Sequence, residues 1–142
     1  MEKINLKGIF EFRPRYSETD QMGVVYYGNY ATYFEVGRVE LLRDLGMSYA
    51  EMEKSGTMLP VVHLDMDFKA GAKYDEELVL ESSILEVPSR KISFYHTLRN
   101  KEGKTLVTGK VILVFVDTKT FKTKQCPADF KALLLKASSA QS

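Results

Sequence analysis

The acidic residue best placed for chemistry is Asp20, which precedes Gly23 and Gly28 in the segment from Tyr16 to Tyr30. Glycine tolerates positive φ and close backbone approach, so two glycines here indicate a tight turn before a helix. A helix start presents unpaired N–H groups and the positive end of the helix dipole. Those groups can bind an oxyanion while a nearby carboxylate attacks an acyl carbon or activates water. The spacing therefore favours acyl transfer, with an aspartate that only bonds its own turn as the structural alternative.

Other titratable residues give weaker signals. Glu18 lies two residues before Asp20, and an extended backbone would put both acids on one side. We interpret Glu18 as a solvated or hydrogen-bonded neighbour. His63 and His96 lie on different expected strands without metal-ligand spacing, and two lone histidines make a poor zinc site. Cys126 is the only cysteine, which excludes an internal disulfide and a cysteine metal cluster, so no metal is expected.

A long helix must follow the turn to position these groups. Its apolar stripe recurs at helical intervals, through Tyr30, Phe34, Gly37, Leu41 and Leu45. Asn29 is expected as the N-cap and Gly46 as the left-handed residue that ends the helix. Gly37 costs about 1 kcal/mol in helix propensity, so we expect a sheet to approach the helix closely there. A second, short helix is expected near Ser48 to Lys54, beginning with a capping box.

Strands are expected on either side of these helices. A short strand runs from Ile9 toward Tyr16, and apolar and polar residues alternate from Leu59 onward through Phe68. Three long strands follow, over residues 77–87, 91–99 and 104–116, with short links that favour antiparallel neighbours. A last helix is expected over residues 128–136, with a frayed tail over residues 137–142. The pattern predicts an α+β fold in which one long helix lies against a curved antiparallel sheet of five to six strands.

Composition excludes several classes of protein. The 44% apolar and 27% charged residues are typical of a globular protein, and 142 residues suit a single domain over residues 1–142. A formal net charge of +1 gives no case for nucleic-acid binding. No apolar run approaches the roughly 18 residues of a membrane span, and the N-terminus lacks the apolar core of a signal peptide. We therefore expect a cytoplasmic protein.

Two segments carry a resemblance to a known family, from Asp20 to Tyr30 and from Phe34 to Arg43. They resemble the 4-hydroxybenzoyl-CoA thioesterase family of hot-dog folds, whose pattern runs roughly Asp-x-x-Gly-x-Val-Tyr/Trp-His/Tyr-x-x-Tyr, followed by an aromatic residue, an acid and an arginine. Weaker matches lie over residues 68–78, 88–94 and 100–103, so the resemblance covers roughly residues 8–118, which we expect to form the core of the domain. It implies a hot-dog acyl-CoA thioesterase.

The resemblance implies roles for particular residues. Asp20 would be the catalytic carboxylate, and the backbone N–H of Tyr27 would polarise the thioester carbonyl. Tyr27 stands where many relatives carry histidine, so no side-chain acid–base role is implied for it. Tyr26 and His63 would wall the acyl pocket. Glu35 is a rival acid, because other hot-dog thioesterases place their carboxylate on this helix; otherwise it pairs with Arg38 at i, i+3 or helps to fix helix-to-sheet packing.

Coenzyme A needs cations or N–H donors for its phosphates. The candidates in this chain are Lys69, Lys73, Ser89, Arg90 and Lys91. In relatives the nucleotide lies near the turn that matches the last three of these. The alternative is that these residues are ordinary solvated surface lysines and their neighbours.

We therefore expect an enzyme that hydrolyses an acyl-CoA to a free carboxylic acid and coenzyme A, without a cofactor. A thiol has a pKa of about 8.5, against 15.7 for water, so a thiolate departs without a strong general acid. The alternatives are an acyl carrier protein thioesterase and a non-catalytic module that binds acyl thioesters. Open sheet edges and the family pattern imply a homodimer whose sheets join, paired again into a homotetramer. The acyl group is left open.

Overall fold

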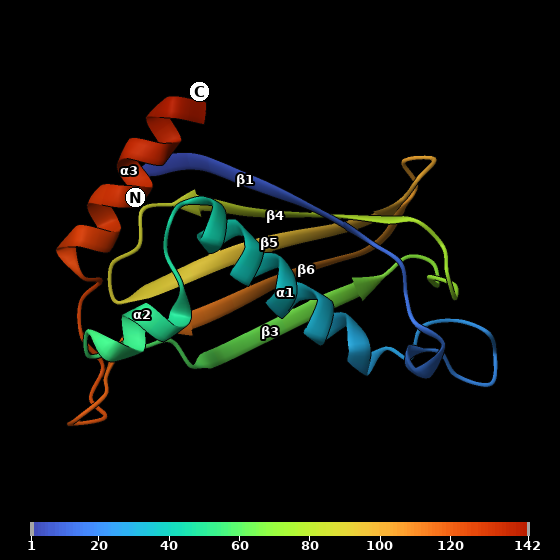
Figure 1. The fold of residues 1–142 in the computed structure, drawn as a ribbon, viewed down its shortest axis with the longest axis horizontal. Helices are drawn as coiled ribbons and strands as arrows, with labels where there is room; N and C mark the ends of the chain where they lie inside the picture. Colours follow the sequence, from blue (N-terminus) through green and yellow to red (C-terminus); the bar gives the residue numbers. More distant parts are fainter. Residues whose placement is uncertain (1, 142) are drawn as a thin grey trace.

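The computed structural model describes residues 2–141 and shows a long helix lying across one face of a curved antiparallel sheet (Figure 1). The elements are, in chain order, β1 Lys3–Phe12, the 3-10 turn η1 Tyr16–Glu18, α1 Gly28–Asp44, α2 Tyr49–Lys54, β2 Thr57–Met58, β3 Val61–Phe68, β4 Leu78–Glu86, β5 Lys91–Asn100, β6 Thr105–Val114, β7 Val116–Asp117 and α3 Ala128–Gln141. The predicted α+β class is confirmed.

The main sheet has the strand order β1-β4-β5-β6-β3, and every neighbouring pair is antiparallel. β2 and β7 form a separate two-stranded sheet. The β5–β6 link is the expected hairpin turn, in which Gly103 takes φ +86° and donates its N–H to the Asn100 carbonyl oxygen at 3.0 Å. Because successive side chains of a strand point to opposite faces of the sheet, alternate residues face α1 and the others form the outer face.

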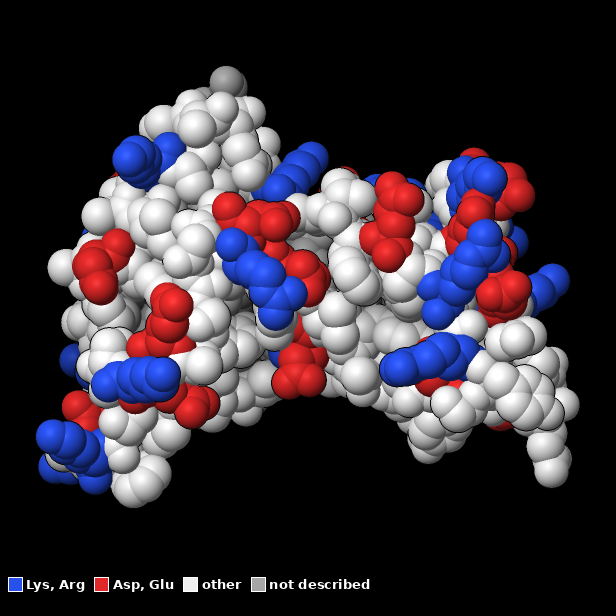
Figure 2. Space-filling model, viewed as in Figure 1, with Lys and Arg blue, Asp and Glu red and all other residues white. Residues whose placement is uncertain are grey.

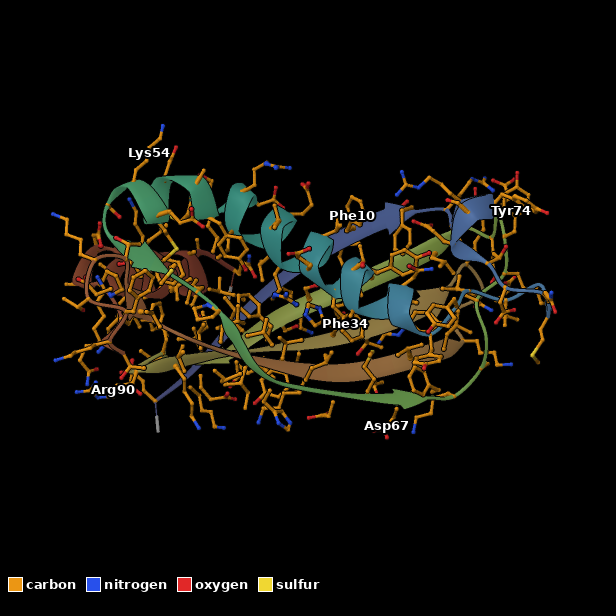
Figure 3. The ribbon with its side chains drawn as sticks, turned by 90° about the horizontal axis from the view of Figure 1, so that it is seen from below. Phe10, Phe34, Lys54, Asp67, Tyr74 and Arg90 are labelled. Atoms are coloured by element: carbon orange, nitrogen blue, oxygen red, sulfur yellow. The ribbon has the colours of Figure 1, made fainter. Side chains whose placement is uncertain are left out.

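α1 sits close to the sheet at Gly37, as the sequence predicts. A Cβ atom on Gly37 would lie 2.7 Å from Leu80 Cδ2 and would also collide with Ser82 Oγ, both on β4. The helix can descend this far only because the side chain is missing. Phe34 points from α1 toward the sheet (Figure 3) and is fully buried.

Several boundaries differ from the predictions. α1 begins at Gly28 with Tyr27 as the N-cap, because the Asn29 side chain instead donates to the Glu18 carbonyl oxygen at 2.9 Å. α3 continues to Gln141 rather than fraying after residue 136. The core also extends beyond residues 8–118, since Phe130 and Leu134 of α3 are buried in it.

The two edges of the sheet are treated differently. α3 lies beside β1 (Figure 1), where Ser138 Oγ accepts from the Asn5 N–H at 3.1 Å and Gln141 Oε1 accepts from the Lys7 N–H at 3.0 Å. These contacts hold the end of α3 in place and occupy backbone donors of the β1 edge. β3 forms the other edge, and most of its side chains are exposed, including the apolar Val61, Leu64 and Phe68. Among the described residues, α3 therefore covers the beginning of the β1 edge, while the β3 edge is open.

His96 is a polar residue inside this core. It is 1% exposed, stacks on Phe34 with ring centroids 4.4 Å apart, and shares a 2.8 Å hydrogen bond between its Nδ1 and Ser82 Oγ. Burial, helped by the nearby Arg38 charge, lowers the pKa of His96 to about 3. The imidazole is therefore neutral in the folded protein across the physiological range.

We predict that His96 makes the protein less stable in acid. Below the ordinary histidine pKa of about 6.5 the unfolded chain takes up a proton that the folded chain refuses until about pH 3, so the free energy of unfolding falls by about 1.4 kcal/mol per pH unit between these limits. Denaturant unfolding of the wild type and His96→Gln across this range measures the difference. The exposed His63→Gln is the matched control for the loss of a histidine. A slope in His96→Gln as steep as in the wild type would contradict the assignment.

Candidate active site

The turn that carries Asp20 is a small hairpin. The Asp20 N–H donates to the Val24 carbonyl oxygen at 2.9 Å, and the Gly23 N–H donates to the Asp20 carbonyl oxygen at 3.0 Å. Gly23 takes φ +80°, which favours glycine at this position. Asp20 Oδ1 accepts from the Met22 N–H at 2.9 Å, so the carboxylate does bond its own turn. The side chain is nevertheless exposed and its second oxygen stays available for chemistry.

Glu18 ties this hairpin to the rest of the site. Its Oε1 accepts from the Arg15 N–H at 2.8 Å and from the Tyr33 hydroxyl at 2.9 Å, and Arg15 also forms an ion pair with it at 3.0 Å. Burial opposes ionisation, but these hydrogen bonds outweigh it and lower the pKa of Glu18. Glu18 is thus a hydrogen-bonded neighbour of Asp20, as interpreted from the sequence, and it connects the turn to α1 through Tyr33.

The first turn of α1 provides the predicted donors. The N–H groups of Asn29 and Tyr30 bond back to the carbonyls of Tyr26 and Tyr27, at 2.9 and 3.2 Å. The N–H groups of Tyr27 and Gly28 have no acceptor among residues 2–141. Two free backbone donors at the positive end of a 17-residue helix are a suitable site for an oxyanion.

Aromatic side chains surround this helix start. The ring centroids of Tyr27 and Phe68 are 6.4 Å apart, those of Tyr30 and Phe68 are 5.9 Å apart, and those of Tyr26 and Tyr27 are 4.7 Å apart. Tyr26, Tyr27 and Phe68 are about half exposed, at 49%, 61% and 54%. The end of the molecule that carries the hairpin has a broad uncharged surface (Figure 2). This surface can hold an apolar acyl group beside the free amides.

The structure does not gather all the predicted substrate-binding residues. Lys69 directly follows Phe68, and Lys73 pairs with Val24 of the hairpin in an isolated bridge, so both lie at the Asp20 end. His63 lies opposite Ile112 on the outer face of the sheet, whereas Phe68 lies opposite the buried Val107 on the inner face. His63 bonds Asp65 at 2.9 Å and, within one chain, faces away from the Asp20 site.

The predicted nucleotide-binding residues lie at the other end of the sheet. Ser89 and Arg90 form the β4–β5 turn and Lys91 begins β5, which is ten residues, or about 33 Å, long. Figure 3 shows Arg90 and Tyr74 at opposite ends of the molecule, and the Tyr74 ring packs on Tyr16 at the hairpin end. One chain alone therefore does not bring Arg90 to Asp20.

Two further expectations need correction or restriction. Glu35 and Arg38 form no ion pair within residues 2–141; Arg38 is buried instead, with its guanidinium carbon 6.0 Å from the Phe94 ring centroid. The sequence did not indicate that Tyr33 and Arg15 fix Glu18. The only signal for Arg15 was its spacing of three residues from Glu18.

Among residues 2–141, His, Cys, Asp and Glu side chains nowhere gather in threes as a metal ion would require. Among the described helices, none is long and apolar enough to cross a membrane.

The sheet wrapped around one long helix, with a carboxylate and free amides at the helix start, is the arrangement of a hot-dog thioesterase. Residues 14–134 match the model of the thioesterase-like superfamily, and the chain belongs to this family. The resemblance to hot-dog thioesterases and the predicted fold are thereby confirmed.

Individual relatives agree with this assignment. YneP of Bacillus subtilis, to which an acyl-CoA thioesterase activity is provisionally ascribed, is 36% identical over 115 residues, covering 81% of this chain and 83% of YneP. The acyl-CoA thioesterase YbgC of Haemophilus influenzae is 34% identical, covering 87% and 90%. The crystal structure of a DHNA-CoA thioesterase from Staphylococcus aureus superimposes with a TM-score of 0.87 at 33% identity, covering 95% of this chain and 93% of that one.

Proposed function

We propose that the protein hydrolyses acyl-CoA thioesters to a free carboxylic acid and coenzyme A. The observation that carries this proposal is the pair of free N–H groups at Tyr27 and Gly28, which begin α1 beside the hairpin of Asp20. Relatives named as acyl-CoA thioesterases over most of their length support the same reaction. We also propose that the reaction takes place in the cytoplasm, since the single cysteine, Cys126, cannot form an internal disulfide.

In this mechanism the thioester carbonyl oxygen accepts hydrogen bonds from the Tyr27 and Gly28 amides. Asp20 then either attacks the carbonyl carbon, giving a mixed anhydride that water hydrolyses, or removes a proton from the attacking water. In both routes the amides stabilise the negative charge that develops on the carbonyl oxygen. The thiolate of coenzyme A departs without a general acid because of its low pKa. The proposed reaction therefore uses no metal or cofactor.

We also propose that the protein is a homodimer joined through β3. α3 occupies backbone donors near the beginning of β1, at Asn5 and Lys7, whereas β3 offers backbone groups and exposed apolar side chains to a second copy. Antiparallel pairing of two β3 strands would put the Phe68 end of one beside the Val61 end of the other. Val61 and Lys91 lie at the same end of the sheet, opposite Leu113 and Val114 of β6. The Arg90 turn of the partner subunit would then approach Asp20, and two such dimers would form the tetramer.

The first prediction concerns Asp20. Asp20→Asn should lower kcat toward acyl-CoA at least about a hundredfold, because the amide cannot act as base or nucleophile. The fold should survive, since the asparagine carbonyl oxygen can still accept from the Met22 N–H. Release of free thiol measures the rate, with Glu35→Gln on α1 as the matched control that should stay within about threefold of wild type. Near-wild-type turnover in Asp20→Asn would remove this residue from the mechanism.

The second prediction concerns β3. Leu64→Lys should convert the dimer to monomers, because a lysine on an edge strand opposes pairing with another strand. Light scattering after gel filtration measures the mass. Ile9→Lys is the control on the opposite edge of the sheet and should leave the mass unchanged. A Leu64→Lys protein with the same mass as the wild type would place the interface elsewhere.

The third prediction concerns the nucleotide. Arg90→Ala should raise KM for acyl-CoA about tenfold, because the variant loses one charge-assisted hydrogen bond to a phosphate of the substrate. The same acyl group on N-acetylcysteamine, which lacks the nucleotide, should be hydrolysed equally well by both proteins. Lys119→Ala, an exposed lysine in the β7 turn, serves as the control. Equal losses on both thioesters would argue against coenzyme A contact, and a preference for acyl carrier protein would favour the second candidate substrate.

A further inference from the structure

A cavity lies farther along α1, away from Asp20. It has a volume of about 210 Å³ and is lined by residues of α1, α2, β2 and the beginning of β3. Its polar lining comes from Arg38, Tyr49 and Thr57, with Glu35 and Glu53 at the rim, and Val61 closes the β3 side. None of these residues takes part in the proposed thioester chemistry.

Arg38 is the unusual member of this lining. It is 5% exposed, forms no ion pair within residues 2–141, and its Nε has no hydrogen-bond acceptor there. The Tyr49 hydroxyl is also buried; burial raises its pKa, while the Arg38 charge and a side-chain hydrogen bond from Arg38 partly offset that rise. A buried guanidinium nitrogen without an acceptor is unfavourable. Arginine can only donate, and the Tyr49 phenol stays protonated, so Arg38 Nε and the Tyr49 hydroxyl each still have a proton to donate.

An apolar strip connects this cavity to the Asp20 end. Val61, Leu64 and Phe68 of β3 lie opposite the buried Leu113, Val111 and Val107 of β6, so they face the α1 side of the sheet. They are 49%, 40% and 54% exposed. Phe68 begins the strip beside Tyr27 and Tyr30, and Val61 ends it at the cavity. From Gly28 to Arg38, α1 rises about 15 Å, the length of path that an acyl group would follow.

We propose that Arg38, with Tyr49, binds the terminal carboxylate of a dicarboxylic acyl group whose other end is the thioester. The aliphatic body would lie on the β3 strip while the carbonyl oxygen meets the Tyr27 and Gly28 amides. This inference rests on the proposed thioesterase function and adds the substrate class to it.

A carboxylate suits the site better than other acceptors. Its planar pair of oxygens matches the guanidinium in two parallel hydrogen bonds and neutralises the buried charge, which a hydroxyl group cannot do. Glu35 and Glu53 oppose an anion, but both are exposed and solvated, whereas Arg38 is buried and so interacts more strongly.

The experiment compares matched acyl chains that differ only at the far end. Hexanedioyl-, octanedioyl- and dodecanedioyl-CoA are assayed beside the corresponding monocarboxylic acyl-CoA substrates. The wild type should prefer the dicarboxylic member of the best-fitting pair by at least about tenfold in kcat/KM. This ratio corresponds to the free energy of one charge-assisted hydrogen-bonded pair. Arg38→Met should abolish or reverse this preference, while kcat/KM for the monocarboxylic substrate stays within about threefold of the wild-type value. Arg38→Lys should retain part of the preference.

Further variants separate binding from structure. Arg43 is an exposed arginine on the same helix, so Arg43→Gln is the matched control. It should change kcat/KM for neither substrate class. Arg38→Met should fold at least as stably as the wild type, because it removes an unpaired buried charge and keeps the side-chain length. If Arg38→Met slows both substrate classes equally, or if the wild type shows no preference, Arg38 is structural and the inference is wrong. If no acyl-CoA of either class is cleaved, the proposed thioesterase function itself fails.

Discussion

The hydrogen bonds of the Glu18 carboxylate hold the candidate site together. The carboxylate receives the Arg15 amide on one side and the Tyr33 hydroxyl on the other, so it links η1 to the second turn of α1. The Glu18 carbonyl oxygen receives both the Tyr26 N–H and the Asn29 side chain. These four contacts join the exposed Asp20 hairpin to the helix whose amides are proposed to act with it. A charged acceptor with several donors is strong enough for this purpose.

Much of the fold could be predicted because single residues have local physical consequences. Gly46 ends α1 with φ +85°, Gly103 forms the hairpin turn, and Gly37 marks the close approach of helix and sheet. Predictions failed where a contact with a residue distant in sequence outweighs the local preference. Asn29 was a good N-cap by propensity, yet Glu18 attracts its side chain away. Residues 137–142 read as a frayed tail, yet contacts with β1, 133 and 134 residues away in sequence, keep α3 helical to Gln141.

The candidate site was predictable only in part for the same reason. Asp20, Tyr27 and Gly28 lie close in sequence, so a local pattern was sufficient to indicate them. Arg90 and Asp20 lie at opposite ends of the sheet, and whether they meet depends on how a second chain pairs with β3. The sequence left two alternatives for Arg38, an ion pair with Glu35 at i, i+3 or a role in helix-to-sheet packing. The structure agrees with the second, because α1 lies close to the sheet at Gly37 and Arg38 is buried over Phe94.

α1 is consequently more than a packing element, because it fixes the separation between two places where an acyl group can be bound. Its first turn presents free amides, and its third turn presents Arg38 in a cavity, with Gly37 bringing that part of the helix down onto β4. A helix keeps such a distance rigidly, at about 1.5 Å per residue. Any acyl group that contacts both ends must therefore have a suitable length, and β3, which α1 leaves uncovered, offers the apolar surface between them. The missing side chain at Gly37 thus contributes to substrate selection as well as to the core.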